Sequence, residues 1–134
     1  MAGYSGTPLV QKLGIRAGMR VYFSGAPPDY ARILGRVPTI VQALRLEGPL
    51  DFIQHFTTAR AELEEKFPAL VRALMPDGML WISWPKQSSR AETDVTEDVV
   101  REVALAHGLV DVKVCAVTDV WSGLKLVRRL TDRV

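Results

Sequence analysis

Apolar residues along this chain recur with two different periods that alternate from one segment to the next. Met19 to Ser24, Leu50 to Phe56 and Met79 to Trp84 are short runs rich in strand-forming residues. The segment 59–74 instead carries apolar residues at three- and four-residue spacing, namely Ala59, Leu63, Phe67, Leu70, Val71 and Leu74. This spacing predicts a helix whose apolar face lies on a sheet.

The range Leu70 to Lys86 contains the clearest helix-to-strand unit of the chain. The turn Pro76-Asp77-Gly78 separates the end of the helical face from the strand Met79 to Trp84. Lys86 and the polar residues after it follow the carboxyl end of that strand, where ligands of wound α/β sheets bind. Pro68 lies inside the preceding helix, and we expect it to kink that helix or to begin a new segment.

The first half of the chain contains shorter elements. Thr7 is a candidate N-cap with Pro8 at the first helical position, and Gly14 closes this short helix. Asp29 to Leu34 suits a brief helix that Gly35 stops. Residues 39–46 favour a second strand, although their last four residues would also tolerate a helix.

The last part of the chain predicts one more helix and two strands. Asp94-Val95-Thr96-Glu97 has the form of a capping box, and Gly108 ends the helix that follows. Val110 to Val117 alternates strongly, and Leu124 to Arg129 follows after a loop that contains Trp121-Ser122-Gly123. The whole order predicts a three-layer α/β fold with a mostly parallel twisted sheet and an antiparallel C-terminal strand pair.

Length and composition set wide limits. With 134 residues, 48% hydrophobic and 24% charged, we expect a single domain over residues 1–134. No run approaches the roughly 20 apolar residues of a membrane span, so we expect no membrane partner. The start lacks the pattern of a secretory signal and Cys115 is the single cysteine, so we expect a cytoplasmic protein without an internal disulfide.

The net charge of +2 is too small to indicate a nucleic-acid partner. Positive residues do gather towards the C-terminus, at Lys125, Arg128, Arg129 and Arg133, but such a group is usually a solvated edge. The sequence contains none of the familiar hydrolase, kinase or zinc-protease signatures, and its two histidines and one cysteine are too far apart for a metal-ligand pattern.

Three segments resemble the second half of a class I methyltransferase fold. Asp51-Phe52-Ile53 matches the fourth strand, Leu70 to Leu80 the helix and turn before the fifth strand, and Leu109 to Arg129 the final strand pair. The resemblance implies a truncated, Rossmann-like and methyltransferase-like sheet that covers roughly Met19 to Arg129.

The resemblance also implies a site for S-adenosylmethionine, but the sequence departs from the family there. The family has a glycine-rich loop after its first strand, whereas this chain has Ser24-Gly25-Ala26-Pro27-Pro28. Fewer than about thirty residues separate Gly25 from Leu50, which leaves room for at most one strand and helix unit. Glu47 either takes the place of the family's ribose-binding carboxylate or belongs to a polar turn. We therefore expect no cofactor, with S-adenosylmethionine as the alternative.

Other motifs are similar to a small bacterial family classed as domain of unknown function 3052. They are Gly3 to Leu9, Trp84-Pro85-Lys86, Asp94-x-Thr96-Glu97-Asp98, Leu109 to Val117 and Trp121 to Lys125. This resemblance implies a compact stand-alone protein related to truncated methyltransferases. It transfers no catalytic residue to this chain.

Candidate ligand-binding residues lie at the predicted carboxyl ends of the strands. Lys86 and Ser88, in a polar loop before a helix, suit an anion such as phosphate, although a loop without a ligand is equally polar. Trp84 and Trp121 would form two aromatic walls beside Lys86 if the three side chains converge. His55 ends its strand near the same rim, without an evident partner at a nearby position.

Together with Gly25 and Ala26, these five residues form the predicted site. The interpretation favoured by the sequence is a non-catalytic, regulatory or small-molecule-binding module for an anionic or planar ligand. One alternative is a minimal S-adenosylmethionine-dependent methyltransferase, or a subunit of one. The other is a protein-interaction domain or homo-oligomer that uses an exposed strand edge.

Overall fold

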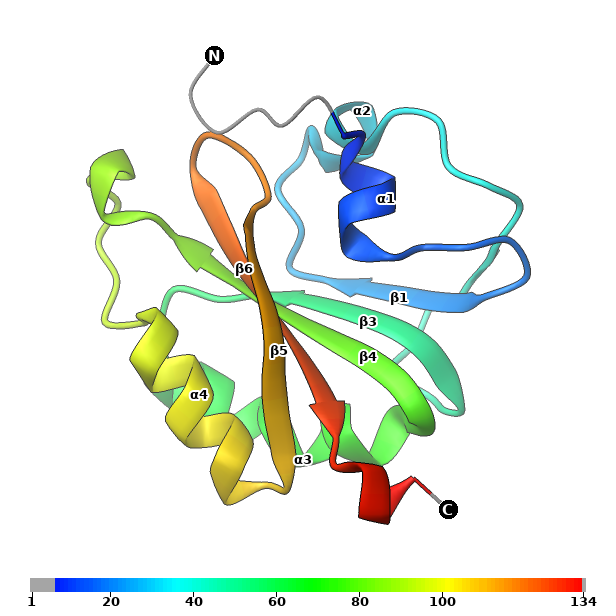
Figure 1. Cartoon of the computed structure of the whole chain (residues 1–134). Helices are drawn as coiled ribbons and strands as arrows, with labels where there is room; N and C mark the ends of the chain where they lie inside the picture. The colour runs from blue at the N-terminus through cyan, green and yellow to red at the C-terminus, as the bar shows by residue number, and fades with distance from the viewer. Residues whose placement is uncertain (1–6, 134) are drawn as a thin grey trace.

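A computed structural model describes residues 7–133 of the chain, and its strands form one six-stranded sheet in the order β2-β1-β3-β4-β6-β5 (Figure 1). The strands are β1 (Arg20–Ser24), β2 (Val41–Gln42), β3 (Leu50–Phe56), β4 (Leu74–Pro85), β5 (Leu109–Ala116) and β6 (Trp121–Arg128). The first four run parallel, and β6 lies antiparallel between β4 and β5. The predicted fold class is confirmed, including the antiparallel C-terminal pair.

Helices cover both faces of this sheet and make it a three-layer structure (Figure 1). The short helices α1 (Leu9–Leu13) and α2 (Tyr30–Leu34) lie on one face. The longer helices α3 (Arg60–Ala73) and α4 (Glu97–Ala106) lie on the other face. None of the helices within residues 7–133 is long and apolar enough to cross a membrane.

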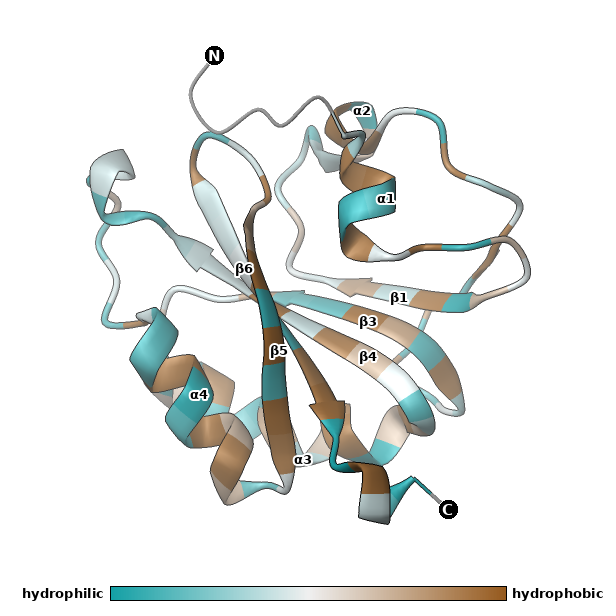
Figure 2. Ribbon diagram, viewed as in Figure 1, coloured by the Kyte–Doolittle hydropathy of each residue, from teal (hydrophilic) through white to brown (hydrophobic). Residues whose placement is uncertain are grey.

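Strand β4 is buried on both faces, and its side chains alternate between two hydrophobic clusters. Leu80, Ile82 and Trp84 pack in the cluster under α3 and α4. Trp81 packs on the α1 face, where its Nε1 donates a 2.9 Å hydrogen bond to the carbonyl oxygen of Leu13. Figure 2 shows the corresponding hydrophobic bands along the central strands.

The expected strand over residues 39–46 is reduced to the two residues of β2. They pair with Arg20 and Val21 only, at the amino-terminal half of β1. The residues after β2 lie on the α3 and α4 face of the sheet, where Ala43 and Leu46 pack against the hydrophobic cluster. As a result, the carboxyl-terminal half of β1 has no strand beside it on this edge within residues 7–133.

The predicted turn at residues 76–78 is a bulge inside β4. Leu50 of β3 pairs with Leu74, but Phe52 pairs with Met79. Four residues of β4 therefore lie opposite a single residue of β3 between these two pairs. A Cβ atom on Gly78 would lie 2.9 Å from the carbonyl oxygen of Leu50. The bulge therefore requires glycine at this position, and the strand begins five residues before the predicted Met79.

The helix ends differ from the expected caps at two places. Pro8, rather than Thr7, is the N-cap of α1, whereas Gly14 closes this helix in a left-handed conformation as expected. Helix α4 is capped by Thr96, whose Oγ1 accepts a 3.2 Å hydrogen bond from the amide of Val99. Asp94 instead accepts from the amide of Arg60 at 2.7 Å and so stabilises the start of α3.

Helix α3 continues through Pro68 as one helix of 14 residues. Its buried side chains, among them Leu63, Phe67 and Leu70, carry the predicted apolar face. Packing of this face on the sheet outweighs the missing amide hydrogen of the proline. The expectation that a new segment begins at this proline is therefore wrong.

Candidate functional site

An open pocket of about 720 Å³ lies at the end of the sheet where the parallel strands finish. Its wall comes from α1, from α2 and the segment before it, from the residue after β4 and from the turn between β5 and β6. The charged and aromatic lining residues are Lys12, Asp29, Arg32, Lys86, Asp119 and Trp121. Two of the predicted site residues, Lys86 and Trp121, therefore line the same pocket.

Backbone hydrogen bonds hold Lys86 against the turn between β5 and β6. Its amide donates a 2.7 Å hydrogen bond to the carbonyl oxygen of Val120. In the same turn, Oγ1 of Thr118 accepts 3.0 Å hydrogen bonds from the amides of Val120 and Trp121. Trp121 is the first residue of β6 and pairs with Pro85, so the loop expected around it is already strand.

The indole of Trp121 packs against a cluster of aromatic rings. It meets Phe56 edge to face, with ring centroids 5.2 Å apart, and Phe56 meets Tyr30 in the same way at 4.9 Å. Phe23 packs against Tyr30 at 5.8 Å. Because edge-to-face contacts restrict both rings, Trp121 is a fixed wall of the pocket.

The charges of the pocket leave an excess of positive side chains. Arg32 and Asp29 form an exposed ion pair of 3.2 Å. Lys12 and Lys86 are half-buried, and neither makes an ion pair with another residue of the described range 7–133. Asp119 is the remaining acidic group of the lining. The arrangement suits a ligand with negative charge beside a flat apolar group.

Trp84 does not join Lys86 and Trp121, so the condition for two aromatic walls beside Lys86 is not met. Trp84 is the cross-strand partner of Ser122, one position from Trp121, so the two indoles occupy opposite faces of the sheet. Trp84 is buried in the core under α3 and α4. Ser88 lies in the exposed 3₁₀ turn Gln87–Ser89 and does not line the pocket.

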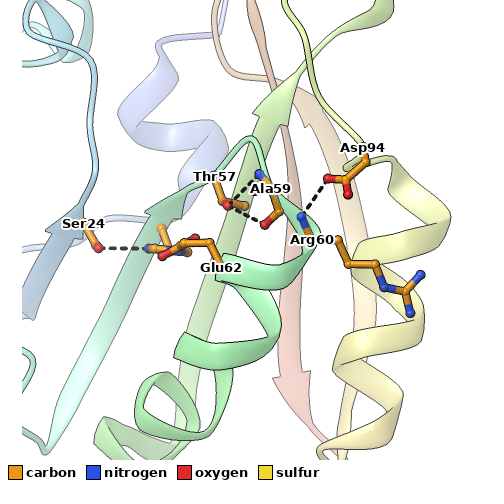
Figure 3. A network of polar contacts seen from close by, with 7 residues as sticks. Ser24, Thr57, Ala59, Arg60, Glu62 and Asp94 are labelled. Atoms are coloured by element: carbon orange, nitrogen blue, oxygen red, sulfur yellow. Dashed lines mark hydrogen bonds and ion pairs between the residues drawn. The ribbon is translucent and has the colours of Figure 1, made fainter.

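His55 is buried in a polar network, in contrast to the surface position without partners that the sequence suggested. Its Nδ1 lies 2.9 Å from Oγ of Ser24, and its Nε2 lies 2.9 Å from Oε1 of Glu62. Figure 3 shows Ser24 at the end of β1 and Glu62 in the first turn of α3. The imidazole side chain is only 3% exposed.

Glu62 is held as a carboxylate. Partial burial alone would raise its pKa, but hydrogen bonds with Thr57 and His55 and the electrostatic influence of the nearby imidazole and of Lys66 outweigh this effect and lower the pKa. Its place in the first turn of α3 also favours a negative charge. Glu62 follows His55 by only seven residues, but their contact depends on how α3 packs on the face of β3 that carries His55, which the sequence pattern does not specify.

Gly25 and Ala26 are exposed residues of the turn that follows β1. Gly25 has a φ of +71°, and a Cβ atom on it would lie 2.9 Å from the carbonyl oxygen of Phe56. The turn therefore packs closely against β3, and only glycine fits at this position. Neither residue lines the pocket. In this segment of the chain, the first residue that lines it is Pro27.

Glu47 does not stand at the carboxyl end of β2. It lies three residues before the amino end of β3, with its amide hydrogen-bonded to Arg45 in a turn. The carboxyl ends and the amino ends of parallel strands lie at opposite ends of a sheet. Glu47 therefore lies at the end opposite to the pocket. Its interpretation as a ribose-binding carboxylate is therefore wrong, and the alternative of a polar turn holds.

The remaining candidates for chemistry are weak within residues 7–133. No group of three or more His, Cys, Asp or Glu side chains in this range could hold a metal ion. Cys115 is half-buried, and its burial raises the pKa of the thiol despite the nearby Lys113 and Lys12.

Solved methyltransferase structures are similar to this fold. One is a SAM-dependent methyltransferase from Aquifex aeolicus, with a TM-score of 0.63 and 16% identity over 92% of this chain and 89% of that one. Another is the magnesium protoporphyrin IX methyltransferase from Synechocystis with bound SAH, with a TM-score of 0.58 and 14% identity over 90% and 78%. A ribosomal protein L11 methylase from Lactobacillus delbrueckii gives 0.57 and 12% over 90% and 75%.

At these identities the likeness shows the fold alone, which is a methyltransferase-like α/β sheet. No protein-family model matches the chain, and no curated protein matches its sequence. The resemblance to domain of unknown function 3052 thus has no support from these comparisons. Part of its first motif, residues 3–6, also lies outside the described residues.

Proposed function

We propose that this protein is a ligand-binding module that holds a small anionic molecule with a planar group in the pocket between α1 and the turn before β6. The observation that carries this proposal is the meeting of Lys12, Lys86 and Trp121, from three separate segments, around one cavity. Two cations without an ion-pair partner in the described residues would bind the anionic group. The indole would stack on the planar group.

The size of the pocket supports a small molecule. About 720 Å³ falls within the roughly 300–1,000 Å³ of known small-molecule sites and would admit a nucleotide-sized ligand. The position at the carboxyl ends of parallel strands is also the usual ligand site of wound α/β sheets. A mononucleotide is therefore the first ligand class to test.

A methyltransferase, alone or as a subunit, is the second candidate function. It is favoured by the fold and by a neighbour solved with SAH, so the expectation of no cofactor is not supported. The residues do not fit the ribose of such a cofactor, because β2 pairs only with the first half of β1 and no carboxylate follows it there. We therefore derive no methyl-transfer step.

A protein partner or a second copy of the chain is a further candidate. Val112 and Val114 are exposed on β5, the strand at one edge of the sheet. An exposed strand edge can pair with another chain. The single domain over residues 1–134, the cytoplasmic location and the absence of a nucleic-acid partner stay as proposals beside it.

The test is calorimetric titration of the purified protein with adenosine 5′-monophosphate, adenosine and S-adenosylhomocysteine. We expect micromolar binding of the monophosphate and at least about tenfold weaker binding of adenosine, since only the former engages the lysines. Binding of adenosine and its monophosphate with equal affinity would contradict the proposed anion site. Preferred binding of S-adenosylhomocysteine would favour the methyltransferase candidate.

A further inference from the structure

We propose that Ser24, His55 and Glu62 form an acyl-transfer site, in which Ser24 is the nucleophile towards carboxylic esters of small acids. Ser24 Oγ and Glu62 Oε1 each lie 2.9 Å from a different nitrogen of the same buried imidazole. A hydroxyl, an imidazole and a carboxylate in series form the arrangement that activates a serine. Figure 3 labels the two outer members of this series, Ser24 on β1 and Glu62 on α3, and His55 of β3 lies between them by its two contacts.

The carboxylate determines which nitrogen carries the proton. An ionised Glu62 only accepts hydrogen bonds, so Nε2 of His55 donates to it. In the neutral imidazole, Nδ1 then has a free lone pair and accepts the hydrogen bond from the Ser24 hydroxyl. This is the tautomer that a general base for Ser24 needs. Glu62 is a positioning residue, since it acts on Ser24 only through His55.

The surroundings of Ser24 leave its hydroxyl within reach of a small substrate. Ser24 is only partly buried, and Gly25 and Ala26 after it are exposed. Beyond Val21, the edge of β1 has no neighbouring strand on the β2 side within the described residues. In this proposal the ester carbonyl approaches from this edge, while the imidazole behind Ser24, with a side chain only 3% exposed, is shielded from water.

The turn after Ser24 also offers donors for the charge that develops on the carbonyl oxygen. The amides of Gly25 and Ala26 donate to no acceptor among residues 7–133. The amide of the residue after a nucleophilic serine is a common oxyanion donor. Stabilisation of the oxyanion there would complete the set of groups that ester cleavage requires.

Hydrolysis of an ester at this site consumes only water. Ser24 Oγ attacks the ester carbonyl carbon while its proton passes to Nδ1 of His55. The tetrahedral intermediate collapses, the bond to the leaving alcohol breaks, and the alkoxide takes the proton from Nδ1. Water then attacks the acyl-serine by the same steps, which releases the carboxylic acid and restores the hydroxyl.

This site is separate from the proposed ligand pocket. His55 follows Ile53 by two residues on β3 and lies on the α3 face of the sheet, with Glu62 from α3 against it. The pocket opens between α1, α2 and the turn before β6, on the other face. Failure of one proposal therefore leaves the other standing.

Hydrolysis of p-nitrophenyl acetate by the full-length protein tests the nucleophile. We expect Ser24→Ala to lower kcat/KM by about a hundredfold, because a positioned general base usually contributes at least this factor to the rate and cannot act without the hydroxyl. Ser122→Ala is the matched control, because Ser122 is also partly buried and its hydroxyl makes no hydrogen bond within the described residues. Equal rates for wild type and Ser24→Ala would overturn the proposal.

Covalent labelling gives a second readout that does not depend on turnover. A fluorophosphonate should modify Ser24 in the wild-type protein, as located by peptide mass spectrometry, and should leave Ser122 unmodified. Glu62→Gln should lower kcat and leave KM unchanged, while its melting temperature reports folding separately. No label on Ser24 in the folded protein would mean that the three side chains are only a structural network and would overturn the proposal.

Discussion

The hydroxyl of Tyr30 donates a 2.6 Å hydrogen bond to Oε1 of Gln54, and both side chains are buried. The side-chain Nε2 of Gln54 in turn donates a 3.1 Å hydrogen bond to Oγ of Ser83. This chain of hydrogen bonds joins α2 to β3 and β4 beneath the aromatic cluster that supports Trp121. The wall of the proposed pocket thus rests on a satisfied polar network inside the core.

Removal of the Tyr30 hydroxyl should destabilise the protein. Tyr30→Phe leaves a buried Gln54 oxygen without its donor, which costs about 1–3 kcal/mol of unfolding free energy. Urea denaturation followed by circular dichroism measures this loss. Tyr22→Phe is the control, because the Tyr22 side chain is only partly buried and its hydroxyl makes no hydrogen bond in the described range. An equal effect of both substitutions would contradict the role of the Gln54 contact.

Substitution of Lys86 should weaken ligand binding without unfolding the protein. Lys86→Ala removes one of the two cations without an ion pair in the described pocket lining, so we expect at least about tenfold weaker binding of an anionic ligand. Its structural contact comes from the backbone amide, which alanine retains. Calorimetric titration with adenosine 5′-monophosphate measures the change. Lys66→Ala, on the exposed side of α3, should bind like the wild type, and unchanged affinity of Lys86→Ala would exclude Lys86 from the site.

Glu62 should stabilise the fold in a pH-dependent way. Its pKa is lower in the folded than in the unfolded protein, so its stabilisation is complete above the unfolded pKa of about 4.5 and is lost as the pH falls through the folded pKa. We expect Glu62→Gln to be less stable than the wild type at pH 7 and the difference to shrink below pH 4. Urea midpoints across this pH range test the prediction, which a constant difference would contradict.

Cys115 should react slowly in the folded protein. Burial raises the pKa of its thiol, so less thiolate is present at pH 8 than in an exposed cysteine. Alkylation by iodoacetamide should therefore proceed faster in urea than in buffer, and the rate in buffer should rise as the pH increases beyond the ordinary thiol range. Equal rates in urea and buffer would show that the thiol is accessible and unshifted.

The fold was largely accessible from the sequence, because each buried element carries its own local pattern. Strand β3 occupies the predicted residues Leu50–Phe56, and α2 ends where Gly35 was expected to stop it. The extent of β2 was not predictable, since its pairing with only Arg20 and Val21 depends on the path of residues 43–49 under the sheet. The bulge before Met79 likewise depends on the distant Leu50.

The site was predictable only in part, because strand-end residues meet across the sheet according to register. Lys86 and Trp121 both lie near predicted strand ends in the sequence, and they line one pocket. Trp84 is two residues from Lys86, and strand parity alone would place both side chains on one face. Strand β4 ends at Pro85, however, so Lys86 leaves that alternation and lines the pocket while Trp84 stays in the core under α3 and α4. The partners of His55 escaped prediction because Ser24 is 31 residues away and only the β1 and β3 pairing brings it close.

The order β4-β6-β5 has a consequence for how the sheet is assembled. Strand β5 precedes β6 in the chain, yet it contacts the sheet only through β6. Until β6 is in place, β5 has no strand to join, and the edge of β4 lacks its antiparallel neighbour. We therefore expect the two last strands to enter the sheet together as a preformed hairpin, so that Trp121 reaches Lys86 only when this hairpin docks on β4.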